Sequence, residues 1–234
     1  MLKLKKSIIF LVLFTCAIIQ AKSQDTLSGN YPTLKIVSGL HVIKDVVTVK
    51  GEMLVEPGAR VEFLDPGVLV CEGAVIIKGV NKNIEFFGKS KLEGAGIIIK
   101  SVDSSNIDIQ NAIFRNLQLP LFFDFAWKRN SVNISENNFI NNVGKVSVIQ
   151  VLNTPFNFNL DSTFLNFNIS SNLFSGNNAS FYFEDLKSDH LNFEILNNTI
   201  VSNNVYGFKN YNKKGITIVI PFFISYPKTL GILK

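Results

Sequence analysis

Short stretches in which apolar and polar residues alternate fill most of this chain. Four stretches in its second half begin alike, with two apolar residues separated by one polar residue, at 107–109, 132–134, 167–169 and 193–195. Because successive side chains on a strand point to opposite faces, the apolar pair faces inward and the polar residue faces outward. The pattern therefore predicts a short strand at the start of each copy.

The four copies also agree further along the chain. Indexed on the second apolar residue, every copy has an apolar residue five positions later, and the last three copies have Asn three and eight positions later. The Asn at the third position falls where the strand must bend, and we expect it to adopt the unusual backbone angle there, which Asn tolerates. Identical Asn side chains stacked from copy to copy can also hydrogen-bond to each other. We therefore expect ladders of structural amides, made by Asn137, Asn172 and Asn198 and by Asn142, Asn177 and Asn203.

Further strand-like segments lie between the copies, at 121–127, 147–151 and 181–184. Aligned on an outward polar residue, they give a second column of Asp124, Gln150 and Glu184 with spacings of 26 and 34 residues. The index residues of the four copies are spaced by 25, 35 and 26 residues. Each column contains one interval that is eight to ten residues longer than the others. The two long intervals overlap, and this overlap predicts a loop insertion near residues 153–162.

The first half of the chain has the same character with different turns. Segments at 54–63, 65–70 and 72–79 are predicted to be short strands closed by Gly or Pro-Gly turns, and no convincing amphipathic helix follows residue 23. We expect residues 24–44 to form a linker and an N-terminal cap, and residues 45–234 to form one all-β array. Hydrophobic residues make up 47% of the chain, enough for a continuous core.

The Ile-x-x-Asn-x-Phe-x-x-Asn repeat resembles the short repeat of right-handed parallel β-helix proteins with pectin-lyase-like folds. The resemblance covers roughly residues 40–215, and 54–79 is similar to the opening coils of secreted bacterial members. It implies a parallel β-solenoid and is nearly silent on activity.

A leucine-rich repeat is the alternative fold, since its core also runs apolar-x-apolar-x-x-Asn-x-apolar. That repeat adds an apolar residue five positions before the index, where this chain has Ser104, Arg129, Phe164 and His190. It also requires a constant period and a helix on the convex side. The sequence therefore favours the β-helix.

Residues 1–23 have the order of a secretory signal peptide. A cationic start at 1–6 precedes an apolar run at 7–19, and Ala21 and Ser23 offer small residues at a cleavage site. The run is shorter than the ~20 residues of a membrane-spanning helix, and Thr15 stands where a lipobox requires a small residue before Cys16. We expect a cleaved signal, no transmembrane span afterwards, and a secreted, periplasmic or outer-surface location in a bacterium.

The formal charge of +5 does not indicate nucleic-acid binding. The first 23 residues hold Lys3, Lys5, Lys6 and Lys22 and no acid, so 19 basic and 18 acidic residues remain after them. Cys71 is then the one remaining cysteine, within an apolar run, and is expected to be a buried structural thiol. We expect no nucleic-acid partner.

Paired carboxylates carry the enzymatic alternative, a polysaccharide lyase or glycoside hydrolase. Asp124 and Glu184 would stand two coils apart, roughly 9.6 Å, at the outer edge of the inverting range for an acid and a base. Under this alternative alone, Glu184, Asp185 and Asp189 could bind calcium. The resemblance implies that lyases of this fold also use an Arg or Lys base, and no arginine falls in the Asp124 column. We therefore expect no cofactor and favour a non-catalytic protein.

The insertion is the stronger candidate for binding, because loops on rigid scaffolds usually carry function. It presents Phe156, Phe158 and Asp161 among amides, with Gln150 nearby, and aromatic faces with amide donors suit sugar rings. The alternative interpretation is that both aromatic rings only cover the core. The sequence thus favours an exported β-helix scaffold of the cell envelope that binds a polysaccharide or surface protein along an elongated face.

The apolar run at 216–224 contains no Asn. It is interpreted either as a last, irregular coil or as a C-terminal end that self-associates.

Overall fold

The structure is a computed structural model, and it describes residues 25–90, 94–100, 106–125, 130–143, 149–153, 165–178, 181–184, 191–203 and 216–219. All regular elements in these ranges are β-strands. The described ranges hold no helix long and apolar enough to cross a membrane. The predicted signal peptide and most of the predicted insertion lie outside the described residues.

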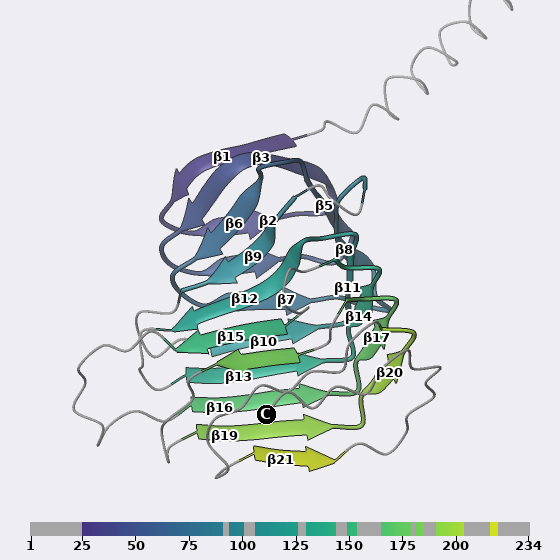
Figure 1. Cartoon of the computed structure of the whole chain (residues 1–234). Helices are drawn as coiled ribbons and strands as arrows, with labels where there is room; N and C mark the ends of the chain where they lie inside the picture. The colour runs from purple at the N-terminus through teal and green to yellow at the C-terminus, as the bar shows by residue number, and fades with distance from the viewer. Residues whose placement is uncertain are drawn as a thin grey trace, which may run out of the picture.

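The strands pair in parallel within two sheets (Figure 1). The smaller sheet has eight strands, in the order β2 (Leu34–Ile36), β4 (Met53–Val55), β7 (Val75–Lys78), β10 (Asn106–Gln110), β13 (Asn130–Ser135), β16 (Leu165–Ser170), β19 (Leu191–Leu196) and β21 (Ile216–Val219).

The larger sheet divides into two rows at the long strand β3 (Gly39–Val49). The first half of β3 pairs with β5 (Ala59–Phe63), and its second half pairs with β6 (Val68–Cys71). The β5 row continues through β8 (Ile84–Phe87), β11 (Ala112–Arg115), β14 (Asn138–Ile140), β17 (Leu173–Ser175) and β20 (Thr199–Val201). The β6 row continues through β9 (Gly96–Ile99), β12 (Leu119–Phe125), β15 (Ile149–Asn153) and β18 (Phe181–Glu184), and β1 (Asp25–Tyr31) pairs with the outer edge of β3.

The chain visits the smaller sheet, the β5 row and the β6 row in turn, so that β10, β11 and β12 form one coil and β13, β14 and β15 form the next. Figure 1 shows these coils stacked from β1 and β3 at one end to β21 at the other. The arrangement is all-β and consistent with a β-solenoid. It does not fit the leucine-rich-repeat alternative, because both of the other sides of each described coil carry strands where that fold has a helix.

The register of the smaller sheet agrees with the alignment of the four sequence copies. Ile109 pairs with Ile134, Ile134 with Ile169, and Ile169 with Ile195. These residues are buried, and so is the apolar residue two positions before Ile109, Ile134 and Ile169. The alternation of apolar and polar residues therefore identified the strands and their pairing partners.

The predicted column of Asp124, Gln150 and Glu184 is wrong in its middle member. Asp124 pairs with Leu152, and Leu152 pairs with Glu184, while Gln150 pairs with Phe122. Asp124 and Glu184 do stand two coils apart, but a leucine occupies the position between them.

The reason for this error lies in the coil formed by β13, β14 and β15, which is ten residues longer than the coil before it. These ten extra residues are divided between two turns. Leu152 follows Asp124 by 28 positions, while the smaller sheet advances by 25 positions over the same coil, so three extra residues precede β15. From Asn153 to Leu165 the chain advances 12 positions, against 5 from Phe125 to Asn130, so the other seven lie at 154–164. A single insertion after Gln150 had been assumed.

A column of phenylalanine rings fills the core behind the β5 row. Phe86, Phe114, Phe139 and Phe174 are fully buried, and neighbouring rings stack with centroids 4.9 to 5.0 Å apart and planes within 13° of parallel. Ile200 takes the next place in the register. Because the ring separation matches the ~4.8 Å spacing of paired strands, the stack and the backbone ladder support the same coil height.

The asparagines form two buried columns at the two ends of the β5-row strands. In the first column, Oδ1 of Asn172 accepts hydrogen bonds from the backbone N–H (2.8 Å) and the Nδ2 amide (3.1 Å) of Asn137 in the preceding coil. Asn198 accepts the same pair of bonds from Asn172, at 2.9 and 3.0 Å. Each Nδ2 also donates to a strand carbonyl of the coil before, that of Ile109 for Asn137 and that of Ile134 for Asn172, at 2.8 Å in both cases.

The second column has the same geometry. Asn177 Oδ1 accepts from the backbone N–H and Nδ2 of Asn142 at 2.9 and 3.0 Å, and Asn203 Oδ1 accepts from the backbone N–H of Asn177 at 2.7 Å. The side chains of both columns are at most 4% exposed. Each amide thus satisfies backbone groups at a turn that would otherwise be buried without partners.

The residue that bends the chain is the one before each ladder asparagine, or before Ala112 and Leu117, which take the equivalent places in the preceding coil. Positive φ angles of 53° to 67° occur at Asn111, Glu136, Ser171 and Asn197 in one turn and at Asn116, Asn141, Gly176 and Ser202 in the other. The ladder asparagines themselves are absent from this left-handed group. The expectation that they supply the unusual backbone angle is therefore wrong, because their role is to bond the neighbouring coils.

We predict that Asn172→Ala lowers the free energy of unfolding by about 3 kcal/mol, because it leaves buried groups of Asn137 and Ile134 unsatisfied. Asn138→Ala is the matched control, since Asn138 accepts one part-buried bond, from Lys82 Nζ at 3.0 Å. Urea unfolding followed by circular dichroism measures both, and equal losses in the two variants would contradict the ladder's contribution.

Glu136 stands at a φ of 58° although glutamate gains nothing from the left-handed region. We predict that Glu136→Asn raises the free energy of unfolding by about 1 kcal/mol, because Asn adopts this conformation more readily. The same urea experiment checks the gain. Glu194→Asn, on a strand, is the control that should show no increase.

Candidate functional site

The outer side of β10, β13 and β16 carries a regular array of polar side chains. The inward residues of these strands are buried and apolar, and the register places the outward residues of successive strands beside each other. We call this surface the amide face, and its outward residues are Asn106, Asp108 and Gln110, Ser131, Asn133 and Ser135, and Asn166, Asn168 and Ser170. The array repeats at ~4.8 Å between strands and ~6.7 Å along each strand.

Asp108 is the centre of the hydrogen bonding on the amide face. Its carboxylate lies 2.7 Å from Lys78 Nζ and accepts hydrogen bonds from Gln110 Nε2 at 2.6 Å and Asn133 Nδ2 at 2.9 Å. Asn168 Nδ2 donates in turn to Asn133 Oδ1 at 3.1 Å. The outer amides thus form a chain of bonds that begins at Asn168 and ends at a carboxylate.

The electrostatics of Asp108 follow from these contacts. Burial raises the pKa of its carboxyl group, but the bonds from Lys78, Asn133 and Gln110 outweigh burial, and the pKa lies below its usual value. Asp108 is therefore a fixed anion that orients the amides around it.

Two amide oxygens of this face have no hydrogen-bond partner in the part of the chain that the structure describes. Asn166 Oδ1 and Asn168 Oδ1 are shielded from solvent and have no partner among the described residues. Buried acceptors are normally satisfied, and the register places Asn192, whose side chain lies outside the described residues, beside Asn166.

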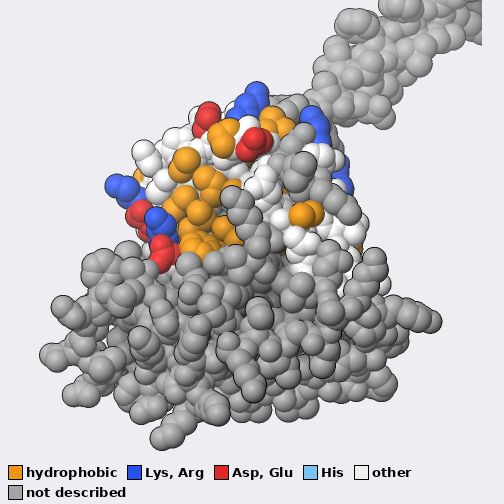
Figure 2. Space-filling model, viewed as in Figure 1, with side chains coloured by type: hydrophobic (Ala, Val, Ile, Leu, Met, Phe, Trp, Pro, Cys, Tyr) orange, Lys and Arg blue, Asp and Glu red, His pale blue; other side chains and the backbone are white. Residues whose placement is uncertain are grey.

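The outward side of the β6 row is different, because it is apolar. Val46 is 55% exposed, and Val68, Val70, Ile98 and Phe122 are partly exposed on β3, β6, β9 and β12. Figure 2 shows apolar side chains gathered over this part of the surface. We call these five residues the apolar strip.

A charged cluster that sequence reasoning missed lies on the β5 row. Glu85 on β8 accepts hydrogen bonds from Arg60 Nε on β5, at 2.8 Å, and from Arg115 Nε on β11. Both guanidinium groups also lie over the ring of Phe87. Burial raises the pKa of Glu85, but the two arginines outweigh it and lower the pKa. The sequence does show outward charged residues on successive strands. These coils contain no repeated Asn, however, so the sequence did not reveal which of the charged residues pair.

The structure brings together some of the predicted site residues. The register keeps Asp124 and Glu184 two strands apart, which corresponds to roughly 9.6 Å. Asp108 and Glu194 share one column, three strands apart.

Other candidate residues lie outside the described part of the chain. They are Phe156, Phe158, Asp161, Asp185 and Asp189, together with the side chains of Gln150 and Glu184. Within the described ranges, no three His, Cys, Asp or Glu side chains converge as a metal site would require. Cys71 is buried, as predicted, and burial raises the pKa of its thiol.

Comparisons of the chain with protein-family models, with curated proteins and with solved structures gave no match. The site must therefore be interpreted from its own geometry.

We predict that the stability of the protein falls as the pH drops below about 4, because a carboxyl group with a lowered folded pKa loses its contribution once it is protonated. The contribution of Asp108 is complete above its unfolded pKa and is lost as the pH falls through its folded pKa. Asp108→Asn should therefore show a weaker loss between pH 6 and pH 2.5 in urea unfolding. Asp45→Asn removes an exposed carboxylate and serves as the control, and equal effects of both substitutions would contradict the role of Asp108.

Proposed function

We propose that this protein is an exported right-handed parallel β-helix of the pectin-lyase-like kind, and that it acts as a non-catalytic scaffold that binds a polysaccharide along the amide face. The two parallel sheets, the three-strand coils and the buried asparagine columns support the β-helix. The order of charges and apolar residues in the first 23 positions supports export.

The observation that carries this proposal is the regular array of amides and hydroxyls on β10, β13 and β16. A polysaccharide is a row of hydroxyl groups, and amides offer it both donors and acceptors. Two coil spacings amount to roughly 9.6 Å, close to the length of an extended disaccharide. A linear glycan lying along the solenoid axis would thus meet equivalent groups at every second coil.

The predicted loop adds to this surface through its place in the chain. Residues 154–164 connect β15 to β16, and β16 carries Asn166 and Asn168 of the amide face. Phe156 and Phe158 therefore precede the amide face directly in sequence. We propose that Phe156, Phe158 and Asp161 extend the binding surface at this edge, whereas Gln150 pairs with Phe122 of the apolar strip and is not part of it.

A surface protein is the second candidate partner, and the apolar strip favours it. Partly exposed Val70, Ile98 and Phe122 follow one another in register on β6, β9 and β12. Val70→Asp with Ile98→Asp would abolish protein binding there and leave glycan binding unchanged.

We predict that Ser131→Tyr with Ser135→Tyr reduces glycan binding at least tenfold, because the new rings would cover the outward side chain of Asn133 between them. Binding is measured by a glycan array followed by titration of the strongest glycan. The matched control is Ser175→Tyr with Thr199→Tyr on the β5 row, which should keep full affinity.

If a glycan still binds the Ser131/Ser135 variant with full affinity, the amide face is not the binding surface. If it still binds the variant with Phe156→Ala and Phe158→Ala, the loop is not part of that surface. Release of reducing or unsaturated ends from a polysaccharide panel with calcium would show the enzymatic alternative instead.

A further inference from the structure

The charged cluster on the β5 row holds two arginines in fixed positions. Arg60 and Arg115 each use Nε to bind one oxygen of the Glu85 carboxylate. Their guanidinium carbons lie 5.1 and 4.9 Å from the centre of the Phe87 ring, so the two carbons are within about 10 Å of each other. Three strands, a carboxylate and an aromatic ring thus fix both groups before any ligand arrives.

The outer edges of both guanidinium groups remain available. The only hydrogen bonds that they make to the described residues are the two Nε bonds, which leaves the Nη groups without partners in this part of the chain. The side chains of Arg60 and Arg115 are 52% and 35% exposed, against 18% for Glu85. The carboxylate is therefore covered, while the donors that it orients face solvent.

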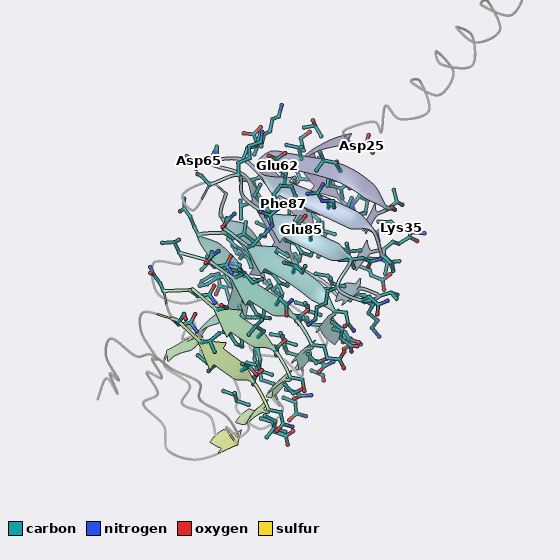
Figure 3. All side chains as sticks on the ribbon, turned by 90° about the vertical axis from the view of Figure 1, so that its right-hand side faces the viewer. Asp25, Lys35, Glu62, Asp65, Glu85 and Phe87 are labelled. Carbon is teal, nitrogen blue, oxygen red and sulfur yellow. The ribbon has the colours of Figure 1, made fainter. Side chains whose placement is uncertain are left out.

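The surroundings of the cluster are positively charged. Lys89 Nζ lies 3.2 Å from Glu62 Oε1, and Lys82 donates to Asn138 two coils further on. The register places Glu62 beside Phe87 and Arg60 beside Glu85, and Figure 3 shows Glu62, Glu85 and Phe87 close together. Among the described residues, four cations and two carboxylates make up this neighbourhood, an excess of two positive charges.

The arrangement suits a tetrahedral oxyanion better than a planar one. The two guanidinium groups approach from β5 and β11, on opposite sides of β8, so a bridging group must offer oxygens in more than one direction. A sulfate ester or phosphate has three free oxygens, whereas a carboxylate has two in one plane. Arg binds such groups through paired N–H donors.

We propose that Arg60 and Arg115 form a binding subsite for a tetrahedral oxyanion, a sulfate or phosphate group, carried by an anionic glycan. The glycan as carrier rests on the proposed function, whereas the oxyanion chemistry rests on the two arginines alone. Nucleic acid is the less suitable carrier, because the one aromatic ring of the cluster is covered by the guanidinium groups and offers no stacking surface for a base.

The test is titration of the full chain with four polymers at constant ionic strength: dextran sulfate, dextran that carries phosphate monoesters, polygalacturonate and single-stranded DNA. The subsite predicts that one or both of the first two bind at least tenfold more tightly than polygalacturonate, and their ratio tells sulfate from phosphate. Equal or tighter binding of polygalacturonate would overturn the preference for a tetrahedral group, and equal or tighter binding of DNA would overturn the glycan.

Variants distinguish binding by the paired N–H donors of arginine from attraction by positive charge alone. Arg60→Gln with Arg115→Gln should weaken binding of the preferred polymer at least tenfold. Arg60→Lys with Arg115→Lys keeps the charge, leaves Glu85 a cationic partner and should weaken it nearly as much. Lys35→Gln with Lys44→Gln removes two positive charges elsewhere and should change affinity less than twofold.

Full binding in the lysine variant, or an equal loss in the Lys35/Lys44 control, would show diffuse attraction and overturn the subsite. Binding of a neutral polysaccharide that the glycan array identifies as a ligand of the amide face is measured on the same variants. If the arginine variants also lose this binding, the proposed function of the amide face is in error. If they keep it, the change in oxyanion binding is due to Arg60 and Arg115 alone.

Discussion

The hydrogen bonds between stacked asparagine side chains are the interaction on which the rest of the structure depends. A parallel solenoid must turn its backbone inside the protein, and each turn leaves N–H and C=O groups away from water. An Asn at that point resolves the problem, because one oxygen accepts two donors from the coil before and one Nδ2 donates to both neighbours. The hydrogen-bonding groups of the side chain are thus fully used by the coils on either side of it.

This constraint fixes the register and, through it, the surface. Once Asn137, Asn172 and Asn198 lie one above another, the residues between them must also align, and Phe114, Phe139 and Phe174 stack as a consequence. The outward residues align for the same reason. The amide face on β13 and β16 is therefore a set of aligned columns. The apolar strip and the charged cluster lie mainly in earlier coils, where the pairing of the parallel strands sets the register.

The sequence predicted the parts of the fold in which the same residue types recur at corresponding positions of each coil. The strands of the smaller sheet and the asparagine positions could be found because apolar alternation and Asn recur together. The left-handed turn residues could not, because Glu136 and Ser171 have no special preference for that conformation and are imposed by the coil. The misplaced Gln150 shows a second limit, since the total length of a coil does not reveal how its extra residues are divided between two turns.

The candidate site was only partly accessible to sequence reasoning, for related reasons. Asp108 follows the predicted alternation of one strand, but its bonds to Lys78 and Gln110 depend on side chains from two neighbouring positions. The Arg60, Glu85 and Arg115 cluster spans coils of unequal length without asparagine markers. Contacts of this kind require the register of strands, which only the folded coils provide.

Native-state hydrogen exchange tests the role of the asparagines most directly. The backbone amides of Asn137, Asn142, Asn172 and Asn177, which donate to the next asparagine, should exchange only through global unfolding, with a protection equal to the free energy measured in urea. Exchange of these amides through local opening, at rates similar to those of exposed turns, would contradict the claim that they hold the coils together.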